Sequence, residues 1–280
     1  MDDLNLTLVD KPTFAELMVE RGLQADNRTL GLKPPEEIAV FVHDDAGRVI
    51  GGAQGELEWG WLYVDLLWLE PSLRGQGIGR EVMTGIEQAA YDQDCPFCWL
   101  ATTSFQALPF YRAIGYEVVG TLEDRPPDHR YYFLQKAIMP DVAVLSATLS
   151  PEQTDIDRLR KGLAEHTRSQ SIAVDSKRLA VFLEDAQGAM YGGLVASTYW
   201  GWLDIQAVWL PEAVRGQGYG AKLLAMAEAE SIRRGCPNSF VDVAGFQGLC
   251  FFEKYGYVTF GTLADRPPGY MTHFMKKALR

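Results

Sequence analysis

The sequence is short of positive charge, and this shortage excludes two classes of partner. Lysine and arginine together number 26 against 37 acidic residues, so the formal net charge is −11. Nucleic acids and anionic membranes are bound by a positive protein field, which this composition does not supply. We therefore expect no nucleic acid and no membrane among the partners. The acidic balance favours a cationic small molecule or protein group as the partner.

Cysteine, clustered histidine and long apolar runs are also scarce. Four cysteines in 280 residues are too few for a disulfide framework, so we expect buried, inert thiols, including the close pair Cys95 and Cys98. The four histidines lack metal-ligand spacing, so no metal is expected. No apolar run has transmembrane length, and the start at Met1 lacks the basic and apolar segments of a secretory signal. These features favour a cytoplasmic location.

What the sequence does contain is an internal duplication. The hexapeptide Arg74-Gly75-Gln76-Gly77-Ile78-Gly79 recurs 141 positions later as Arg215-Gly216-Gln217-Gly218-Tyr219-Gly220. The same offset aligns Trp59-Gly60-Trp61-Leu62 with Trp200-Gly201-Trp202-Leu203. A repeat of this length is a whole domain and not a solenoid turn. The sequence thus predicts two copies of one fold in tandem.

The predicted division falls near Ile138 to Asp141. It separates an N-terminal domain, residues 1–139, from a C-terminal domain, residues 140–280, which we call the first and second halves. Residues 4–9 and 143–149 are expected to form the first strand of each half.

Each half shows the same order of predicted elements. Long apolar strands at 61–69 and 202–210 precede the hexapeptides, and helical periodicity follows each hexapeptide at 78–93 and 219–234. Further strands and a hairpin closed by a Pro-Pro turn complete each copy. The predicted class is α/β (α+β), with a mixed, mostly antiparallel twisted sheet flanked by helices in each half.

Each hexapeptide forms a predicted glycine turn between a strand and a helix. Such a turn leaves backbone N–H groups of the helix start unpaired, and the helix dipole adds positive potential there. Phosphate is the guest that this arrangement favours. Taken alone, a glycine-rich hexapeptide is equally compatible with a tight structural turn.

The junction residues of both halves resemble those of the GNAT acetyltransferase superfamily. Both hexapeptides fit the acetyl-CoA loop of that superfamily, Gln/Arg-x-x-Gly-x-Gly/Ala, and Phe110 to Tyr116 is similar to its aromatic-x-x-x-Gly-Phe/Tyr signature. The resemblance covers nearly the whole chain. It implies two tandem GNAT domains, acetyl-CoA as cofactor, and direct acetyl transfer to an amine without an acyl-enzyme.

The resemblance also implies which residues hold the cofactor. In that family the loop N–H groups bind the CoA diphosphate, and the preceding strand bonds the pantetheine arm. The cofactor-binding residues implied are Leu67, Leu69, Arg74, Gly75, Gln76, Gly77, Ile78 and Gly79 in the first half, and Val208, Leu210, Arg215, Gly216, Gln217, Gly218, Tyr219 and Gly220 in the second.

For the proton donor to the departing thiolate, Tyr111 lies at the position of the family's tyrosine. A phenol with an ordinary pKa of about 10 is protonated at neutral pH and can donate. A packing role at the helix end is the alternative. The second half has Phe252 at the equivalent position, which cannot donate a proton.

For the general base, Asp65 interrupts the apolar strand before the first glycine turn. A carboxylate in such a run is costly unless it is hydrogen-bonded, hydrated or functional. Glu58 is a second candidate for the base. In the second half, Gln206 and Tyr199 occupy the positions of Asp65 and Glu58. We give a structural carboxylate with satisfied hydrogen bonds at least the same weight as a general base. In the second half, Asp204 lies two residues before Gln206 on the same face of the strand, so a second acceptor pocket stays an alternative.

The function expected from these residues is acetyl-CoA-dependent N-acetylation of a primary amine on a small cationic molecule. Tyr111 and Asp65 place the chemistry in the first half, and the second half is expected to bind CoA while being impaired or supportive. Alternatives are a protein lysine or N-terminal acetyltransferase, and an acyl-CoA sensor with little turnover. The acceptor and the oligomeric state are open, with a homodimer among the expectations.

Overall fold

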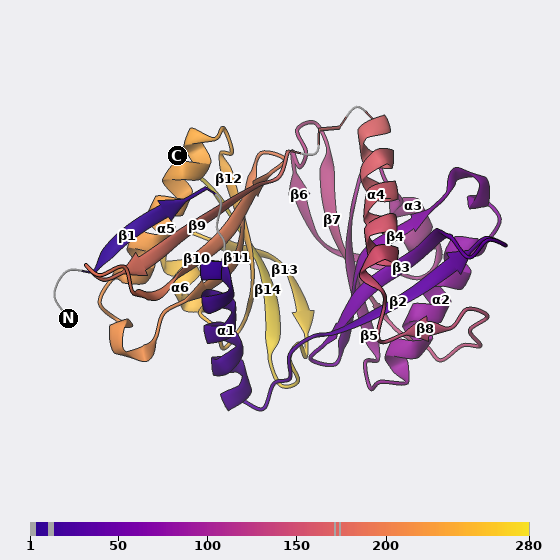
Figure 1. The fold of residues 1–280 in the computed structure, drawn as a ribbon, viewed down its shortest axis with the longest axis horizontal. Helices are drawn as coiled ribbons and strands as arrows, with labels where there is room; N and C mark the ends of the chain where they lie inside the picture. The colour runs from indigo at the N-terminus through magenta and orange to yellow at the C-terminus, as the bar shows by residue number, and fades with distance from the viewer. Residues whose placement is uncertain (1–3, 11–13, 171, 174, 280) are drawn as a thin grey trace.

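The computed structural model describes residues 4–10, 14–170, 172–173 and 175–279 and contains two seven-stranded sheets. The sheets lie side by side along the long axis of the molecule (Figure 1). One strand pair in each sheet is parallel, β4 with β5 and β11 with β12, and the other pairs of the described chain are antiparallel. This confirms the prediction of mixed, mostly antiparallel sheets flanked by helices.

The first sheet has the strand order β6-β7-β5-β4-β3-β2-β8. Its strands are β2 (Glu36–His43), β3 (Val49–Glu58), β4 (Trp61–Leu69), β5 (Phe97–Thr103), β6 (Glu117–Glu123), β7 (Arg130–Ala137) and β8 (Ala147–Thr148). One face carries α2 (Ile78–Tyr91) and α3 (Leu108–Ala113), and the other face carries α4 (Gln153–Ser169). Both faces of β4 are therefore buried, which explains its near-continuous apolar sequence.

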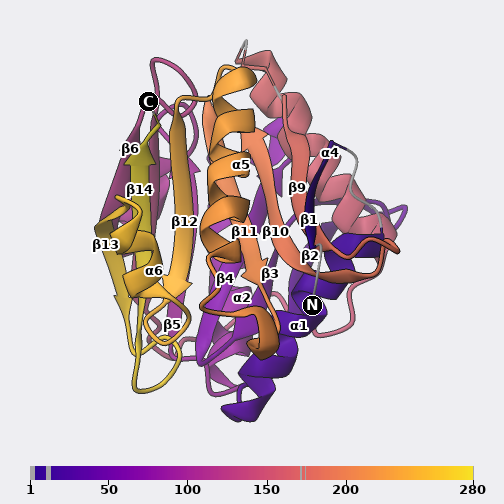
Figure 2. The ribbon, with the colours of Figure 1, turned by 90° about the vertical axis from the view of Figure 1, so that its left-hand side faces the viewer.

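The second sheet has the strand order β1-β9-β10-β11-β12-β14-β13. Its strands are β1 (Asn5–Val9), β9 (Lys177–Glu184), β10 (Met190–Tyr199), β11 (Trp202–Trp209), β12 (Asn238–Ala244), β13 (Val258–Ala264) and β14 (Met271–Ala278). Helices α5 (Tyr219–Arg233) and α6 (Leu249–Lys254) cover its outer face, which is turned to the viewer in Figure 2, and α1 (Phe14–Thr29) covers the inner one. Short 3₁₀ turns, η1 (Pro71–Leu73) and η2 (Glu212–Val214), precede the two glycine turns.

The two halves exchange their first strand and first helix. β1 pairs with β9 and α1 packs on β10 and β11, whereas β8 pairs with β2 and α4 packs on β3 and β4. Glycine permits close helix contacts, because a Cβ at Gly22 would lie 2.2 Å from the Trp209 indole and one at Gly162 would lie 2.1 Å from that of Trp68. Each sheet therefore contains segments of both halves. The division at residues 139 and 140 stays a prediction about the sequence repeat.

The exchange accounts for the one strand that is much shorter than expected. Residues 4–9 form β1 over Asn5–Val9, close to the prediction, but the strand expected at 143–149 is reduced to Ala147–Thr148. The preceding segment is solvent-exposed, with Val142 and Val144 at 87% and 77% exposure. This segment leads the chain to the edge of the first sheet and makes only a short pairing with β2.

An aromatic core joins the inner faces of the two sheets. Its buried members are Trp61, Trp99, Leu122 and Phe133 from the first half and Trp202, Leu263 and Phe274 from the second. The Trp61 indole N–H donates to the Asp265 carbonyl at 3.4 Å, and the Trp202 indole donates to the Asp124 carbonyl at 3.2 Å. Burial of so many rings makes this a large apolar interface, so the halves form one packed body.

The thiols follow the prediction with one exception. Cys95, Cys98 and Cys236 are buried free thiols, whereas Cys250 is exposed. The prediction of a buried thiol is therefore wrong for Cys250, which lies near the start of the six-residue helix α6. No helix of the described residues is both long and apolar enough to cross a membrane.

Candidate functional site

Both glycine turns adopt a backbone shape that only glycine takes readily. Gly77 and Gly218 are the N-caps of α2 and α5, with φ values of 88° and 85°, and Gly75 and Gly216 also have positive φ. A Cβ at any of the four would strain the backbone, although it would meet no atom within 4 Å. The turns leave open space in front of the helix N-terminus, where unpaired N–H groups favour an anion.

The strand before each glycine turn separates from its parallel neighbour. β4 and β5 pair only as far as Val64 and Leu100, although β4 continues to Leu69. β11 and β12 likewise pair only as far as Ile205 and Val241. The backbone groups of β4 beyond this point are not used by β5, so they can bond an extended ligand.

Asp65 lies at this point of separation, where β4 also carries a β-bulge. Gln54 and Gly55 of β3 pair with Leu66 and Val64, so Asp65 has no partner residue on β3. Bulges commonly redirect a side chain beside an active site. Gln206 occupies the equivalent bulge of β11, between Ile205 and Ala207.

A cavity of about 540 Å³, the first cavity, lies between the first glycine turn and this bulge. Of the residues predicted from the sequence, it is lined by Asp65, Leu67, Leu69, Arg74, Gly75, Gly77, Gly79 and Tyr111. The two others point elsewhere: the Gln76 amide donates to the Ser72 carbonyl, and Ile78 packs against the core. Leu163 and His166 of α4 also line it, and sequence reasoning missed both because they belong to the other half.

The Tyr111 side chain is buried, with 7% of its surface exposed, and lines the first cavity. Burial, and to a smaller extent the nearby Cys98, raises the pKa of its phenol above the ordinary value. The hydroxyl therefore stays protonated throughout the neutral range. The raised pKa makes the phenol a weaker acid than a free one, so it donates a hydrogen bond readily and a proton only to a stronger base.

Asp65 lines the first cavity and is solvent-exposed. Neighbouring protein removes part of its hydration and so raises its pKa, an effect that Arg160 and a hydrogen bond from Tyr63 oppose. Tyr63 Oη donates to Asp65 Oδ1 at 3.4 Å. A raised pKa brings a carboxylate closer to the range in which a general base is effective.

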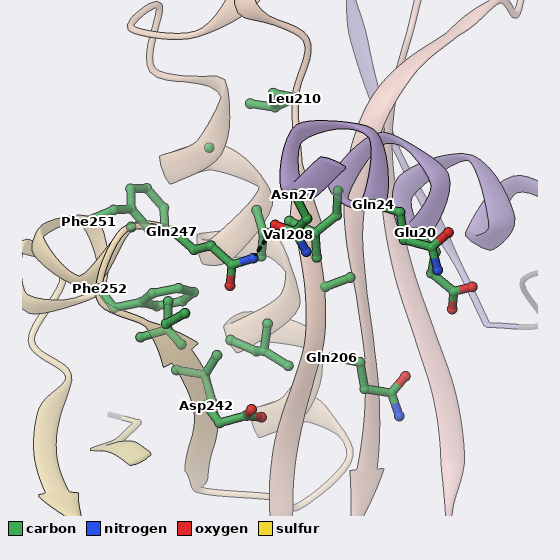
Figure 3. Close-up of a pocket in the computed structure, with 18 of the residues that line it drawn as sticks. Glu20, Gln24, Asn27, Gln206, Val208, Leu210, Asp242, Gln247, Phe251 and Phe252 are labelled. Carbon is green, nitrogen blue, oxygen red and sulfur yellow. Dashed lines mark hydrogen bonds between the residues drawn. The ribbon is translucent and has the colours of Figure 1, made fainter. Parts of the chain in front are cut away.

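The second half has a larger cavity of about 640 Å³, the second cavity, beside the second glycine turn (Figure 3). Predicted residues in its wall are Val208, Leu210, Arg215, Gly216, Gly218 and Gly220. Gln217 instead donates its amide to the Ala213 carbonyl at 2.8 Å, and Tyr219 packs against the core. Helix α1 closes one side, where the Gln247 amide donates to Asn27 Oδ1 at 2.7 Å.

The polar groups of the second cavity differ from those of the first. Phe252 and Gln206 replace Tyr111 and Asp65 there, as the sequence predicts. Asp242 of β12 follows the last paired residue, Val241, and also lines this cavity. Sequence reasoning missed Asp242, although it interrupts the apolar run Phe240–Ala244 in the same way that Asp65 interrupts β4.

Two other candidate carboxylates are held in cross-interface ion pairs. Glu58 accepts a bond from Arg266 Nη2 at 2.7 Å and lines the second cavity, so the structure does not place it beside Asp65. Asp204 accepts a bond from Arg125 Nη2 at 2.6 Å and lies outside the second cavity wall. The Asp-Arg-Pro-Pro turns at 124–127 and 265–268 therefore join the halves through the buried Arg125 and Arg266.

The arginine of each glycine turn contacts an exchanged helix. Arg74 Nη1 lies 3.5 Å from His166 Nδ1, and because a guanidinium only donates, this contact requires an unprotonated Nδ1. Burial and the Arg74 charge lower the pKa of His166, which keeps the ring neutral near pH 7. In the second half, Arg215 forms an ion pair with Asp26. The charge of Arg74 is therefore less compensated than that of Arg215.

His129 and the duplicated tryptophans lie away from the first cavity. His129 Nδ1 lies 3.1 Å from Ser104 Oγ. Trp61 and Trp202 belong to the aromatic core between the sheets, whereas Trp59 lines the second cavity.

Comparison with known proteins identifies the family. The model of the Acetyltransferase (GNAT) family matches residues 7–116 and 148–257. Acetyltransferase Atu2258 of Agrobacterium fabrum is 37% identical over 103 residues, which cover 37% of this chain and 75% of that protein. Blasticidin-S acetyltransferase of Streptomyces morookaense is 33% identical over 119 residues, covering 41% of this chain and 88% of that protein.

A solved acetyltransferase structure from Bacillus cereus matches 46% of this chain and 95% of its own, with 26% identity and a TM-score of 0.44. The two family matches together cover most of the sequence, and each contains one glycine turn. The chain therefore belongs to the GNAT acetyltransferase family, as an N-acetyltransferase with two tandem domains of that family.

Proposed function

We propose that the first half transfers the acetyl group of acetyl-CoA to a primary amine of a small cationic molecule, with Tyr111 as general acid. One observation carries the proposal: the Tyr111 phenol and the Asp65 carboxyl line one cavity together with the first glycine turn. The second cavity has Phe252 and Gln206 at the matching positions. The chemistry therefore belongs to the first half.

The residues of the first cavity fit acetyl-CoA. Backbone N–H groups near Gly77 and Gly79 suit the diphosphate, and Arg74 adds a positive charge at the same turn. The free edge of β4 at Leu67 and Leu69 suits the amides of the pantetheine arm. When bound, acetyl-CoA supplies an activated thioester. The equivalent cradle at Gly218 and Gly220 suits CoA as well.

Proton movements follow from the two titratable groups. Asp65 accepts a proton from the acceptor ammonium, directly or through water, so that the amine lone pair can attack the acetyl carbonyl. Tyr111 donates its proton to the sulfur as the carbon–sulfur bond breaks, and the second proton of the attacking nitrogen returns to the phenol oxygen. The proton on Asp65 passes to water. Both groups are placed before the reaction begins, which lowers the reorganisation cost.

A small cationic acceptor is supported by two facts. The net charge of −11 favours association with cations. One relative is named blasticidin-S acetyltransferase, and we take that name as support for a small acceptor. A cytoplasmic location and a homodimeric state are parts of the same proposal that rest on the sequence alone.

The test is thiol release from acetyl-CoA by the purified chain across a panel of primary amines, polyamines and lysine peptides. Tyr111→Phe should lower kcat by about 10²-fold or more on the best acceptor, as loss of a general acid does. Tyr91→Phe, an exposed tyrosine at the end of α2, is the matched control and should keep full activity. Equal thermal unfolding temperatures should show that both variants fold.

Three results would contradict the proposal. Full turnover by Tyr111→Phe would remove the general acid. Turnover confined to lysine peptides would replace the small acceptor. Binding of acetyl-CoA without thiol release on any amine would favour a sensor of acyl-CoA.

A further inference from the structure

We propose that Tyr63 and Arg160 are positioning residues for Asp65, and that both depend on the second half of the chain. Tyr63 belongs to β4, as Asp65 does, and Arg160 belongs to the exchanged helix α4. The inference rests on the proposed function, in which Asp65 is the general base. It deepens that function by giving the second half a part in the chemistry of the first cavity.

Tyr63 orients the Asp65 carboxylate from within the strand. The bulge leaves Asp65 without a partner residue on β3, so strand pairing alone does not fix this side chain. Tyr63 Oη donates to Asp65 Oδ1 at 3.4 Å. Burial, and to a smaller extent the charge of Asp65, raises the pKa of Tyr63 well above its ordinary value. The phenol therefore keeps its proton, and can donate, over the whole range in which a carboxyl titrates.

The second half holds the Tyr63 ring in place through the aromatic core. The ring stacks on Trp99, with centroids 4.2 Å apart and an angle of 22° between the planes. Trp99 in turn contacts Phe274, at 5.5 Å between ring centroids, and the Arg266 guanidinium lies 5.3 Å from its ring. Phe274 and Arg266 belong to the second half. Packing of this kind restricts the ring, so the hydroxyl stays near the carboxylate.

Arg160 brings a positive charge to the same part of β4. Trp68 of this strand packs in one cluster with Leu159 of α4, and Arg160 is the next residue of the helix. Leu163, one turn further on, lines the first cavity together with Asp65. Neighbouring protein raises the pKa of Asp65 by removing part of its hydration, and the charge of Arg160 opposes this rise. Arg160 therefore favours the ionised carboxylate that a general base requires.

Tyr63 and Arg160 are the groups around Asp65 that favour its ionised form. The other titratable and charged groups of the cavity wall and its surroundings are Arg74, Arg80, Tyr111, His166, Glu56 on β3, Tyr131 on β7 and Asp157 on α4. Asp157 lies 3.4 Å from Arg160 in an exposed ion pair, which water screens. Burial, and then the charge of Asp65, raises the pKa of Glu56, so this second carboxyl must be told apart from Asp65 in a titration.

The second half lacks the whole set. With α1 and α4 matched at Gly22 and Gly162, the positions of Asp65, Tyr63 and Arg160 are occupied by Gln206, Asp204 and Glu20. Glu20 and Gln206 both line the second cavity (Figure 3). The carboxylate on the strand, the phenol that donates to it and the arginine on the helix thus occur together in one half and are all replaced in the other. This is the pattern expected of groups that act as a unit.

The test follows the ionisation of Asp65 by carbon-13 NMR of the full chain labelled at its aspartate carboxyl carbons, with Asp65→Asn identifying the resonance. Tyr63→Phe and Arg160→Gln should each raise the midpoint of this titration by about 0.2–0.7 of a pH unit, because each removes an interaction that favours the ionised form. The matched controls are Tyr131→Phe, another phenol of the aromatic core, and Lys161→Gln, the same loss of charge at the next position of α4. Both controls should leave the midpoint unchanged.

Salt separates the two contributions. Raising the salt to about 1 M, where screening acts within about 3 Å, should abolish the shift of Arg160→Gln and retain that of Tyr63→Phe. Absence of the shift in either variant would overturn the role of that residue, and equal shifts in the controls would overturn the proposal. The acid limb of thiol release is measured in the same variants. If the NMR midpoint moves and the rate does not follow it, the positioning stands and the general-base role in the proposed function fails.

Discussion

The first and second cavities share a glycine turn and differ in the polar groups opposite it. At the separation of the parallel strands, the first half has its carboxylate on β4, as Asp65, and the second half has it on β12, as Asp242. The first half has a phenol at Tyr111 where the second half has a phenyl ring at Phe252. The two halves therefore retain the glycine turn and differ in the polar groups opposite it, which are the groups to which we assign the proton transfers.

The interface between the halves keeps a buried arginine in each half, although the carboxylate that pairs with it differs. Arg125 and Arg266 are equivalent, but Arg125 pairs with Asp204 of β11 and Arg266 pairs with Glu58 of β3. A buried guanidinium without an anion would be costly, so each turn keeps one carboxylate partner. Because Glu58 also borders the second cavity, the ion pair joins the interface to that site.

The largest expected difference between the halves is in kcat after the carboxylate of the first cavity is removed. Asp65→Asn should lower kcat about 10²-fold, as loss of a general base does, whereas Gln206→Asn should leave kcat unchanged. The pH profile gives a second readout. Because the pKa of Asp65 is raised, the wild-type rate should fall as the pH drops through a value above the ordinary one, and Asp65→Asn should lack this limb. Equal kcat in both variants would erase the distinction between the cavities.

The exchanged helices should respond alike, in contrast to the sites. Gly162→Ala and Gly22→Ala each place a Cβ against a tryptophan ring and should lower the free energy of unfolding by about 1–3 kcal/mol. The higher helix propensity of alanine offsets up to about 1 kcal/mol of this loss. Lys161→Ala, on the exposed face of α4, is the control in chemical denaturation. A stabilising effect of both glycine variants would contradict this close packing of the helices on the tryptophan rings.

The smallest expected difference concerns cofactor affinity at the two turns. Asp26 compensates Arg215, whereas neutral His166 leaves the charge of Arg74 available to phosphate. Both arginines are partly exposed, so each effect should be about 1 kcal/mol or less, or up to about fivefold in Kd. Asp26→Asn should tighten CoA at the second turn, and His166→Asp should weaken it at the first. Calorimetry with CoA measures both, and opposite signs would refute the charge argument.

The sequence predicts much of the fold because its strongest signals are local. The strand at 61–69 is found with the predicted bounds, since its apolar run is closed by Gly60 and by the turn at Pro71. The exchange escapes prediction because the first helices of the two halves carry similar apolar faces, which suit either sheet. Trp68 and Trp209 are equivalent, so the glycine contacts do not distinguish the two arrangements. The ion pairs of Glu16 with Arg178 and of Arg158 with Glu70 do, because Glu37 and Pro211 occupy the positions equivalent to Arg178 and Glu70.

The candidate site is predictable to the extent that its residues share a local pattern. The glycine turns, Tyr111 and Asp65 stand in motifs or in apolar runs, and the structure brings them to one cavity. Asp242 carries the same signal as Asp65, a carboxylate in an apolar strand, and could have been found by the same criterion. His166 could not, because its place in the first cavity depends on the exchange.

The most direct test of the difference between the halves is to move the phenol from one to the other. The double variant Tyr111→Phe/Phe252→Tyr is compared with Tyr111→Phe by kcat of thiol release at saturating acetyl-CoA and amine. We predict equal, strongly reduced kcat in both, because the second bulge has Gln206 where the first has Asp65. Recovery of wild-type kcat in the double variant would show that the second cavity is competent for the chemistry and would contradict the account.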